Sequence, residues 1–149
     1  MITTATIDSI LKQKAAGLWA VTPETTVYDA ISLMSEKNIG AVLVKSDDKL
    51  VGVLTERDYT RKVALKGKSS KDTLVREIIS TPVITATPSH TVEDCMRMMT
   101  ENRIRHLPVL AGQELIGVVS IGDLVNWVIS AQSVAIKQME NYIAGNYYC

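Results

Sequence analysis

Two short stretches of this sequence place a hydroxyl three residues before a carboxylate. The strings LVGVLTERD and LIGVVSIGD end in Thr55-x-x-Asp58 and Ser120-x-x-Asp123. This spacing is that of a helix N-cap, in which the hydroxyl and the acid bond to backbone N–H groups. The same position suits a nucleotide, because a helix start binds phosphate and a nearby carboxylate accepts hydrogen bonds from a ribose. Helix capping and nucleotide binding are therefore both open interpretations of these motifs.

The sequence carries few of the residues that catalytic or metal sites need. It has two histidines and two cysteines, which give too few ligands for a His/Cys zinc site at any known spacing. It contains no Walker loop, no G-x-G-x-x-G loop and no nucleophile–His–acid set. Cys95 falls on the predicted apolar face of a helix and Cys149 is the last residue, a usage typical of a reducing compartment. We therefore expect no metal, no catalytic cofactor and no enzymatic activity.

The charge and hydropathy of the sequence argue against nucleic-acid and membrane partners. The 149 residues include 16 basic and 16 acidic side chains, which argues against binding nucleic acid through its phosphates. The first twenty residues lack the apolar stretch of a signal peptide. No segment has the ~20 apolar residues that span a bilayer. The sequence thus predicts a cytoplasmic protein with no nucleic-acid or membrane partner.

The two motifs belong to a duplication that runs through most of the chain. Shifting the sequence by 65 positions aligns residues 18–63 with 83–128 without a gap. Matching positions include Thr22 with Thr87, Pro23 with Pro88, Met34 with Met99, Gly52 with Gly117, and Asp58 with Asp123. A gapless match over a whole unit indicates a tandem repeat.

Each repeat predicts the same order of elements, strand–helix–strand–strand–helix. An extended piece ends at a Thr-Pro step, and a helix with Thr26 or Thr91 as N-cap follows. Its apolar residues recur at i, i+3, i+4 and i+7, the pattern of one buried face. Two apolar runs joined by a polar turn predict a hairpin. The last helix begins at the hydroxyl–acid motif and is expected to end near Leu65 or Ser130.

The sequence thus predicts an α/β protein of the α+β kind, built from two small tandem units. About 50 residues bury too little surface to be stable alone, so we expect the units to pack with pseudo-twofold symmetry. The units are expected at 10–66 and 74–130, with a polar linker at 67–73. Residues 1–17 are expected to pack across, and 131–149 to form a C-terminal helix and tail.

The repeated unit, its Thr-Pro start and its terminal apolar-Gly-apolar-apolar-Thr/Ser-x-x-Asp phrase resemble a tandem CBS domain pair, or Bateman module, of the small stand-alone bacterial type. The resemblance covers about residues 10–130. It implies a non-catalytic sensor that binds an adenine nucleotide (AMP, ADP, ATP, NAD(H) or S-adenosylmethionine) in clefts between the units. It also implies a homodimer of modules, and a regulated protein that the sequence does not identify. A dimerisation scaffold with degenerate clefts is the alternative.

The resemblance implies which residues contact the ligand. Asp58 and Asp123 match its ribose-binding aspartates, and Thr55 and Ser120 match the hydroxyls beside the ribose or phosphate. The glycine inside each apolar run lacks a side chain and is expected to let a flat base approach the strand. The candidates for the base pocket are Trp19, Val21, Ile39, Gly40, Ala41, Val83 and Ile104.

For the phosphate, the resemblance assigns Arg105 and His106 to the cleft of Asp58, and the neutral Gly40 and Ala41 to the other cleft. A solvated strand-edge charge is the alternative for Arg105. A hydrogen-bonded structural histidine is the alternative for His106.

The residue beside each aspartate adds to this difference. Arg57 precedes Asp58, whereas Gly122 holds the same place in the second copy. Because guanidinium–phosphate contacts are strong, we predict tighter phosphate binding at the Asp58 cleft. Trp19 is expected either to stack on the adenine or to pack in a core, and Trp127 to lie in a module–module interface.

Overall fold

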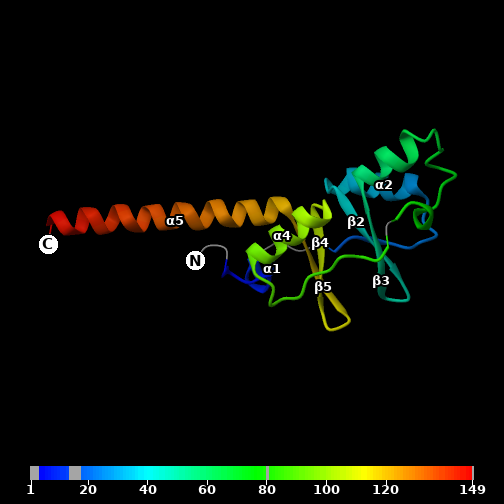
Figure 1. Cartoon of the computed structure of the whole chain (residues 1–149). Helices are drawn as coiled ribbons and strands as arrows, with labels where there is room; N and C mark the ends of the chain where they lie inside the picture. The colour runs from blue at the N-terminus through cyan, green and yellow to red at the C-terminus, as the bar shows by residue number, and fades with distance from the viewer. Residues whose placement is uncertain (1–3, 14–17, 80, 149) are drawn as a thin grey trace. The chain divides into compact units, whose positions relative to one another are not determined.

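The computed structural model describes residues 4–13, 18–79 and 81–148, with side chains at 4–12, 18–79 and 81–143. The chain divides into two compact units. The first unit comprises residues 17–85 and 113–115, and the second comprises 1–16, 86–112 and 116–149. Helices and small sheets occur in both units, so the predicted α+β class is confirmed (Figure 1).

The first unit is a three-stranded sheet with helices at its connections. Its elements are β1 (Ala20–Val21), α2 (Val27–Lys37), β2 (Ala41–Ser46), β3 (Lys49–Thr55), α3 (Glu56–Tyr59), a π turn (Thr60–Ala64) and a 3₁₀ turn (Val75–Glu77). β1 pairs in parallel with β2, and β2 pairs antiparallel with β3. Asp47 and Asp48 form the tight turn of this hairpin, with φ angles of 52° and 61°.

The second unit repeats this plan with a smaller sheet. Its elements are α1 (Ile7–Gln13), α4 (Val92–Asn102), β4 (His106–Ala111), β5 (Glu114–Ser120) and α5 (Ile121–Tyr148). The extended piece that precedes the second Thr-Pro step, residues 83–86, forms a parallel bridge between Ala86 and Val109 instead of a regular strand. Pro82 and Pro88 bracket this piece, and a proline has no N–H to extend a ladder.

The last helix is longer than predicted. We expected a helix that ends near Ser130 and a further one beyond it, but α5 continues for 28 residues (Figure 1). Residues 123–144 contain neither glycine nor proline, so nothing in this stretch breaks the helix.

The helices α2 and α4 begin and pack in the same way. Thr26 and Thr91 are their N-caps, and each side chain accepts a 3.1 Å hydrogen bond from the backbone N–H three residues on. The buried residues are equivalent, namely Val27, Ala30 and Met34 in α2 and Val92, Cys95 and Met99 in α4. Both helices end at a left-handed residue, Asn38 or Arg103. The predicted caps and apolar faces are therefore confirmed.

A short segment precedes each repeat and packs beside the start of α2 or of α4. We call these two segments, residues 5–11 and 73–79, the crossover segments. In the first unit, Val27 N–H donates to the Thr73 carbonyl at 2.8 Å. In the second unit, Val92 N–H donates to the Ala5 carbonyl at 2.9 Å. These contacts are equivalent at an offset of 68 positions, not 65, so the duplication extends beyond the gapless alignment.

The crossover segments explain the glycine of each apolar run. A Cβ built on Gly52 would lie 2.7 Å from Cδ1 of Ile79, and one built on Gly117 would lie 2.7 Å from Cδ2 of Leu11. Real Cβ atoms do not approach a carbon this closely. Our interpretation that these glycines admit a nucleotide base is therefore wrong, because a side chain of the crossover segment occupies that space.

Replacing Gly52 with alanine should lower the free energy of unfolding by about 1–3 kcal/mol, the usual cost of overpacking. Ile79→Ala opens space at the same point, so the double variant should lose less stability than the sum of the two single variants. Urea unfolding of the three variants measures this coupling. Gly122→Ala is the control, since its Cβ would meet Ser120 Oγ at an ordinary 3.6 Å. Additive losses in the double variant would contradict the packing argument.

Candidate functional site

The first motif is a capping box at the end of β3. The Asp58 N–H donates to Thr55 Oγ1 at 3.1 Å. In return, Asp58 Oδ2 accepts from the Thr55 N–H at 3.0 Å and from the Thr55 hydroxyl at 3.1 Å. The carboxylate is half-buried, with 17% of the side chain exposed. The capping interpretation of this motif is therefore confirmed, and one carboxylate oxygen carries the cap.

The second motif has the same geometry at the end of β5. The Asp123 N–H donates to Ser120 Oγ at 3.1 Å, and Asp123 Oδ2 accepts from the Ser120 N–H at 2.8 Å. The two repeats therefore hold their carboxylates in the same orientation at the start of α3 and of α5.

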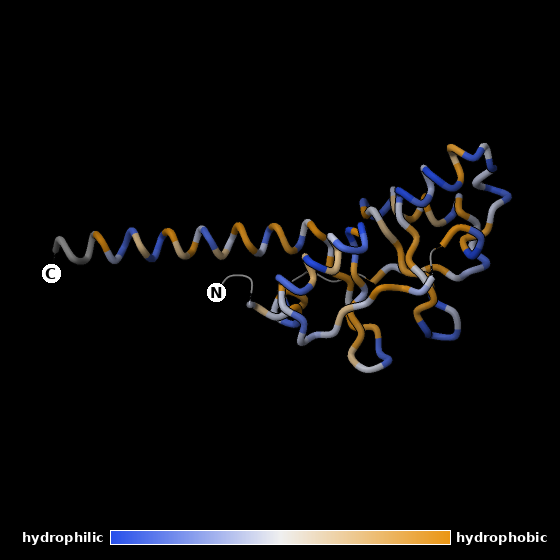
Figure 2. The backbone as a smooth tube through the Cα atoms, in the orientation of Figure 1, coloured by the Kyte–Doolittle hydropathy of each residue, from blue (hydrophilic) through white to orange (hydrophobic). Residues whose placement is uncertain are grey.

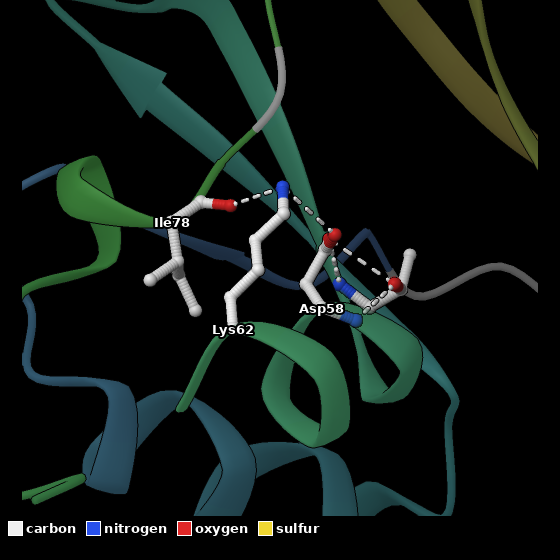
Figure 3. A network of polar contacts seen from close by, with 4 residues as sticks. Asp58, Lys62 and Ile78 are labelled. Carbon is white, nitrogen blue, oxygen red and sulfur yellow. Dashed lines mark hydrogen bonds and ion pairs between the residues drawn. The ribbon is translucent and has the colours of Figure 1, made fainter. Parts of the chain in front are cut away.

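Lys62 approaches the first carboxylate from the next turn of the chain (Figure 3). Its Nζ lies 3.4 Å from Asp58 Oδ1 and donates to the Ile78 carbonyl at 2.8 Å. The ammonium thus ties the carboxylate to the crossover segment of the first unit. Lys62 is not among the residues predicted from the sequence, although the i, i+4 spacing of an acid and a lysine indicates such a pair.

The position equivalent to Lys62 in the second repeat holds an uncharged aromatic residue. Trp127 takes the place of Lys62 at the 65-residue offset. Its Nε1 atom is buried and has no hydrogen-bond partner among the described residues. The prediction that Trp127 lies in a module–module interface stays a prediction.

The residues before the second strand of each repeat lie beside the motif of their own unit. The Glu56 N–H, at the start of α3, donates to the Gly40 carbonyl at 3.1 Å, and Ala41 pairs with Thr55 across the sheet. In the second unit, the Ile121 N–H donates to the Arg105 carbonyl at 2.8 Å. The backbone of Arg105 is therefore next to the Ser120 motif.

This arrangement bears on the predicted phosphate residues. Arg105 is exposed and His106 is half-buried, and both belong to the unit that carries Asp123. Their predicted assignment to the Asp58 cleft stays a prediction. Arg57 and Gly122 are exposed next to the aspartates, as their places in the two motifs imply.

The remaining base-pocket candidates divide into core and surface residues. Val21 and Ile39 pack against the hydrophobic core of the first unit. Trp19 is 38% exposed, and Lys37 Nζ lies 4.4 Å from the centre of its ring. Val83 and Ile104 are half-buried. Trp19 is thus the one aromatic residue among these candidates, and its ring is partly exposed.

The same capping geometry occurs at a third aspartate, outside the motifs. Asp94 Oδ2 accepts from the Thr91 N–H at 2.9 Å, and the Asp94 N–H donates to Thr91 Oγ1 at 3.1 Å. Hydrogen bonds from the backbone and side chain of Thr91 lower the pKa of this carboxyl. Asp94 is therefore a natural comparison for an aspartate that only caps.

No cluster of three or more His, Cys, Asp or Glu side chains that could hold a metal occurs in the part of the chain the structure describes. Cys95 is a free thiol inside the second unit. Within residues 4–13, 18–79 and 81–148, no helix combines the length and apolar character that crossing a membrane requires.

Two copies of a strand–helix–hairpin–helix unit, each with a capped aspartate after a glycine-bearing strand, define a tandem-repeat module. The CBS domain family matches residues 17–65 and 75–130. The chain belongs to the CBS domain family. Tandem CBS domains are regulatory rather than catalytic modules, and the predicted resemblance is confirmed.

Individual relatives agree with this assignment. A CBS-domain protein from Burkholderia ambifaria is 51% identical with a TM-score of 0.83, over 86% of this chain and 96% of that one. The mitochondrial CBS domain-containing protein CBSX3 of Arabidopsis thaliana is 42% identical, over 95% of this chain and 73% of its own length. Inosine-5'-monophosphate dehydrogenase of Thermoplasma acidophilum is 33% identical over 72% of this chain but only 21% of the enzyme. The similarity to the enzyme is therefore confined to a part of it.

Cys95 should not react with alkylating reagents in the folded protein. Burial, with a contribution from the Asp94 carboxylate, raises the pKa of its thiol to about 11. The thiolate, the reactive form, is therefore scarce at pH 8. Iodoacetamide labelling followed by peptide mass spectrometry should show Cys95 modified only after unfolding in urea. Equal labelling with and without urea would contradict the burial.

The raised pKa also predicts a dependence of stability on pH. Because the folded pKa of Cys95 exceeds the ordinary value of 9.0, its contribution is complete below pH 9 and is lost as pH rises towards 11. The Cys95→Ala variant should lack this part of the alkaline loss of stability.

Proposed function

We propose that this protein is a regulatory module that binds an adenine nucleotide at both hydroxyl–acid motifs. The observation that carries the proposal is the presence of two equivalent capped carboxylates in a tandem CBS pair. Each carboxylate is held through Oδ2 by its own backbone, at 3.0 Å in Asp58 and 2.8 Å in Asp123. A carboxylate fixed in this way is preorganised for a ribose diol, because binding does not have to order the side chain.

The charges beside each motif favour a phosphorylated ligand. In the first unit, Lys62 lies next to Asp58, and Arg57 is exposed beside it. In the second unit, the backbone contact of Arg105 with α5 supports a role for Arg105 at the Asp123 motif. Each motif then has a cation of its own unit for the phosphate. This proposal differs from our prediction of tighter phosphate binding at the Asp58 cleft, which assigned Arg105 to that cleft.

Binding would regulate through conformation or assembly. Asp58 is linked by Lys62 to Ile78, which lies in a crossover segment, so a ligand that competes for the carboxylate also acts on that segment. A ligand shifts the equilibrium between two conformations of the crossover segment only by its difference in affinity for them. The output is a change in this chain's own geometry or in its contacts with a further protein. A scaffold without ligand is the alternative outcome of the experiments below.

Asp58→Ala and Asp123→Ala should each abolish binding at one motif. Isothermal titration with AMP, ATP, NADH and S-adenosylmethionine should identify the ligand of the unsubstituted chain and then show about half the binding stoichiometry in each variant. Asp94→Ala is the matched control, because it removes the same type of cap but no ligand contact. All three substitutions should lower stability by a comparable amount, about 1 kcal/mol for a lost cap.

The stoichiometry distinguishes the two functions. Loss of one binding event in Asp58→Ala and in Asp123→Ala, with full binding in Asp94→Ala, supports the sensor. No binding of any of the four ligands to the unsubstituted protein would support the scaffold. Equal weakening in all three variants would show that stability, and not a ligand contact, is responsible.

Arg105→Ala should weaken binding of AMP at least tenfold at the Asp123 motif and leave adenosine unaffected, since a charged hydrogen bond to phosphate is lost. Titration in the Asp58→Ala background isolates this motif. Arg97→Ala is the control, because Arg97 is an exposed arginine paired with Glu93 at 3.1 Å. If AMP binding is instead lost in the Asp123→Ala background, Arg105 serves the Asp58 motif.

A further inference from the structure

Helix α5 carries an apolar row that no described element of its own unit covers. Ile129, Ile136 and Ile143 recur at intervals of seven residues, with Val125 and Met139 between them. These five side chains are 41–65% exposed. Apolar and polar bands alternate along the helix (Figure 2). We call this row, residues 125, 129, 132, 136, 139 and 143, the α5 seam.

The seam follows the heptad rule of coiled coils. Isoleucine occupies every a position, and Val125, Gln132 and Met139 occupy the d positions. Leu124 lies outside this row and is fully buried in the part of α5 that contacts α1 and α4. The helix therefore packs on its own unit with one face and presents the seam on another. Residues after 130 also lie outside the segments that match the CBS domain family.

We propose that the α5 seam pairs with the α5 seam of a second copy of this chain in a parallel, two-stranded coiled coil. In parallel coiled coils, isoleucine at a without isoleucine at d favours two strands over three or four. Gln132 selects the same orientation, because only a parallel, in-register pair places its amide against the equivalent amide. An antiparallel pair would bury that amide against isoleucine and leave it without a hydrogen bond.

The charges along α5 and the area that the seam can bury are both compatible with a second copy of the chain as the partner. Lys137 and Glu140 are the only charged residues between 124 and 143, and neither occupies a seam position. In the parallel register, Glu140 at e faces the small Ala135 at g of the other copy, so no like charges meet. Twelve seam side chains, six from each copy, and their flanks bury roughly 1,000 Å², about the minimum that a specific interface needs. This inference does not depend on nucleotide binding.

The first experiment compares Ile136→Glu with Val134→Glu in the full chain by sedimentation equilibrium. The two side chains are 57% and 56% exposed, but only Ile136 belongs to the seam. Ile136→Glu should raise the dissociation constant of the assembly at least tenfold and halve its mass at intermediate concentrations. Val134→Glu should retain the mass of the unsubstituted protein. Circular dichroism confirms that both variants are folded.

The second experiment tests the orientation. In a Cys149→Ser background, Gln132→Cys should form an intermolecular disulfide on mild oxidation, because equivalent d positions face each other in a parallel pair. Val134→Cys, on an outer face, should not. The proposal is overturned if the unsubstituted chain is monomeric, if both glutamate variants behave alike, or if the two cysteine variants cross-link equally or not at all.

Discussion

In each unit, a crossover segment contacts the glycine of the last strand, and this contact determines the position of the hydroxyl–acid motif that follows the strand. Gly52 and Leu54 point to the same side of β3, where Leu54 joins the core of the first unit together with Val75 and Ile78. Because alternate residues of a strand face opposite sides, a shift by one residue would expose this core. The register of β3 is thus fixed by packing at Gly52, and Asp58, six residues later, lies at a defined place in the first turn of α3. Gly117 and Leu11 impose the same constraint on β5.

Features encoded by neighbouring residues could be predicted from the sequence, and features created by distant packing could not. The tandem repeat, the α+β class, the caps at Thr26 and Thr91 and the buried helix faces all depend on local spacing. The glycines correctly indicated a close approach, but the sequence could not tell a nucleotide from Ile79. The crossover segments escaped the alignment because their offset is 68 positions, three more than in the rest of the repeat. The role of Lys62 was not predicted because it also depends on the Ile78 carbonyl, which is remote along the chain.

The hydroxyl–acid motif alone does not separate a cap from a ligand site. Asp58, Asp94 and Asp123 make equivalent bonds to their N-cap residues, all through Oδ2. The difference lies in their surroundings. Asp58 has Lys62 at 3.4 Å and follows a buried strand, whereas Asp94 follows an irregular stretch at the start of α4. A carboxylate that caps a helix through one oxygen can contact another partner with the second, as Asp58 contacts Lys62 through Oδ1, so one residue can serve stability and recognition together.

The two repeats diverge where their last helices end. In the first repeat, Gly67 adopts a φ of +67°, and Lys68 N–H bonds back to the Val63 carbonyl at 3.0 Å. The left-handed glycine stops the helix and lets the chain continue into the crossover segment at 73–79. The equivalent position in the second repeat is Gln132, which remains helical inside α5. A glutamine does not readily adopt the left-handed conformation, so the same helix continues here to Tyr148. The residue at this position thus contributes to whether the chain turns back to complete a unit or extends a helix with an exposed apolar row.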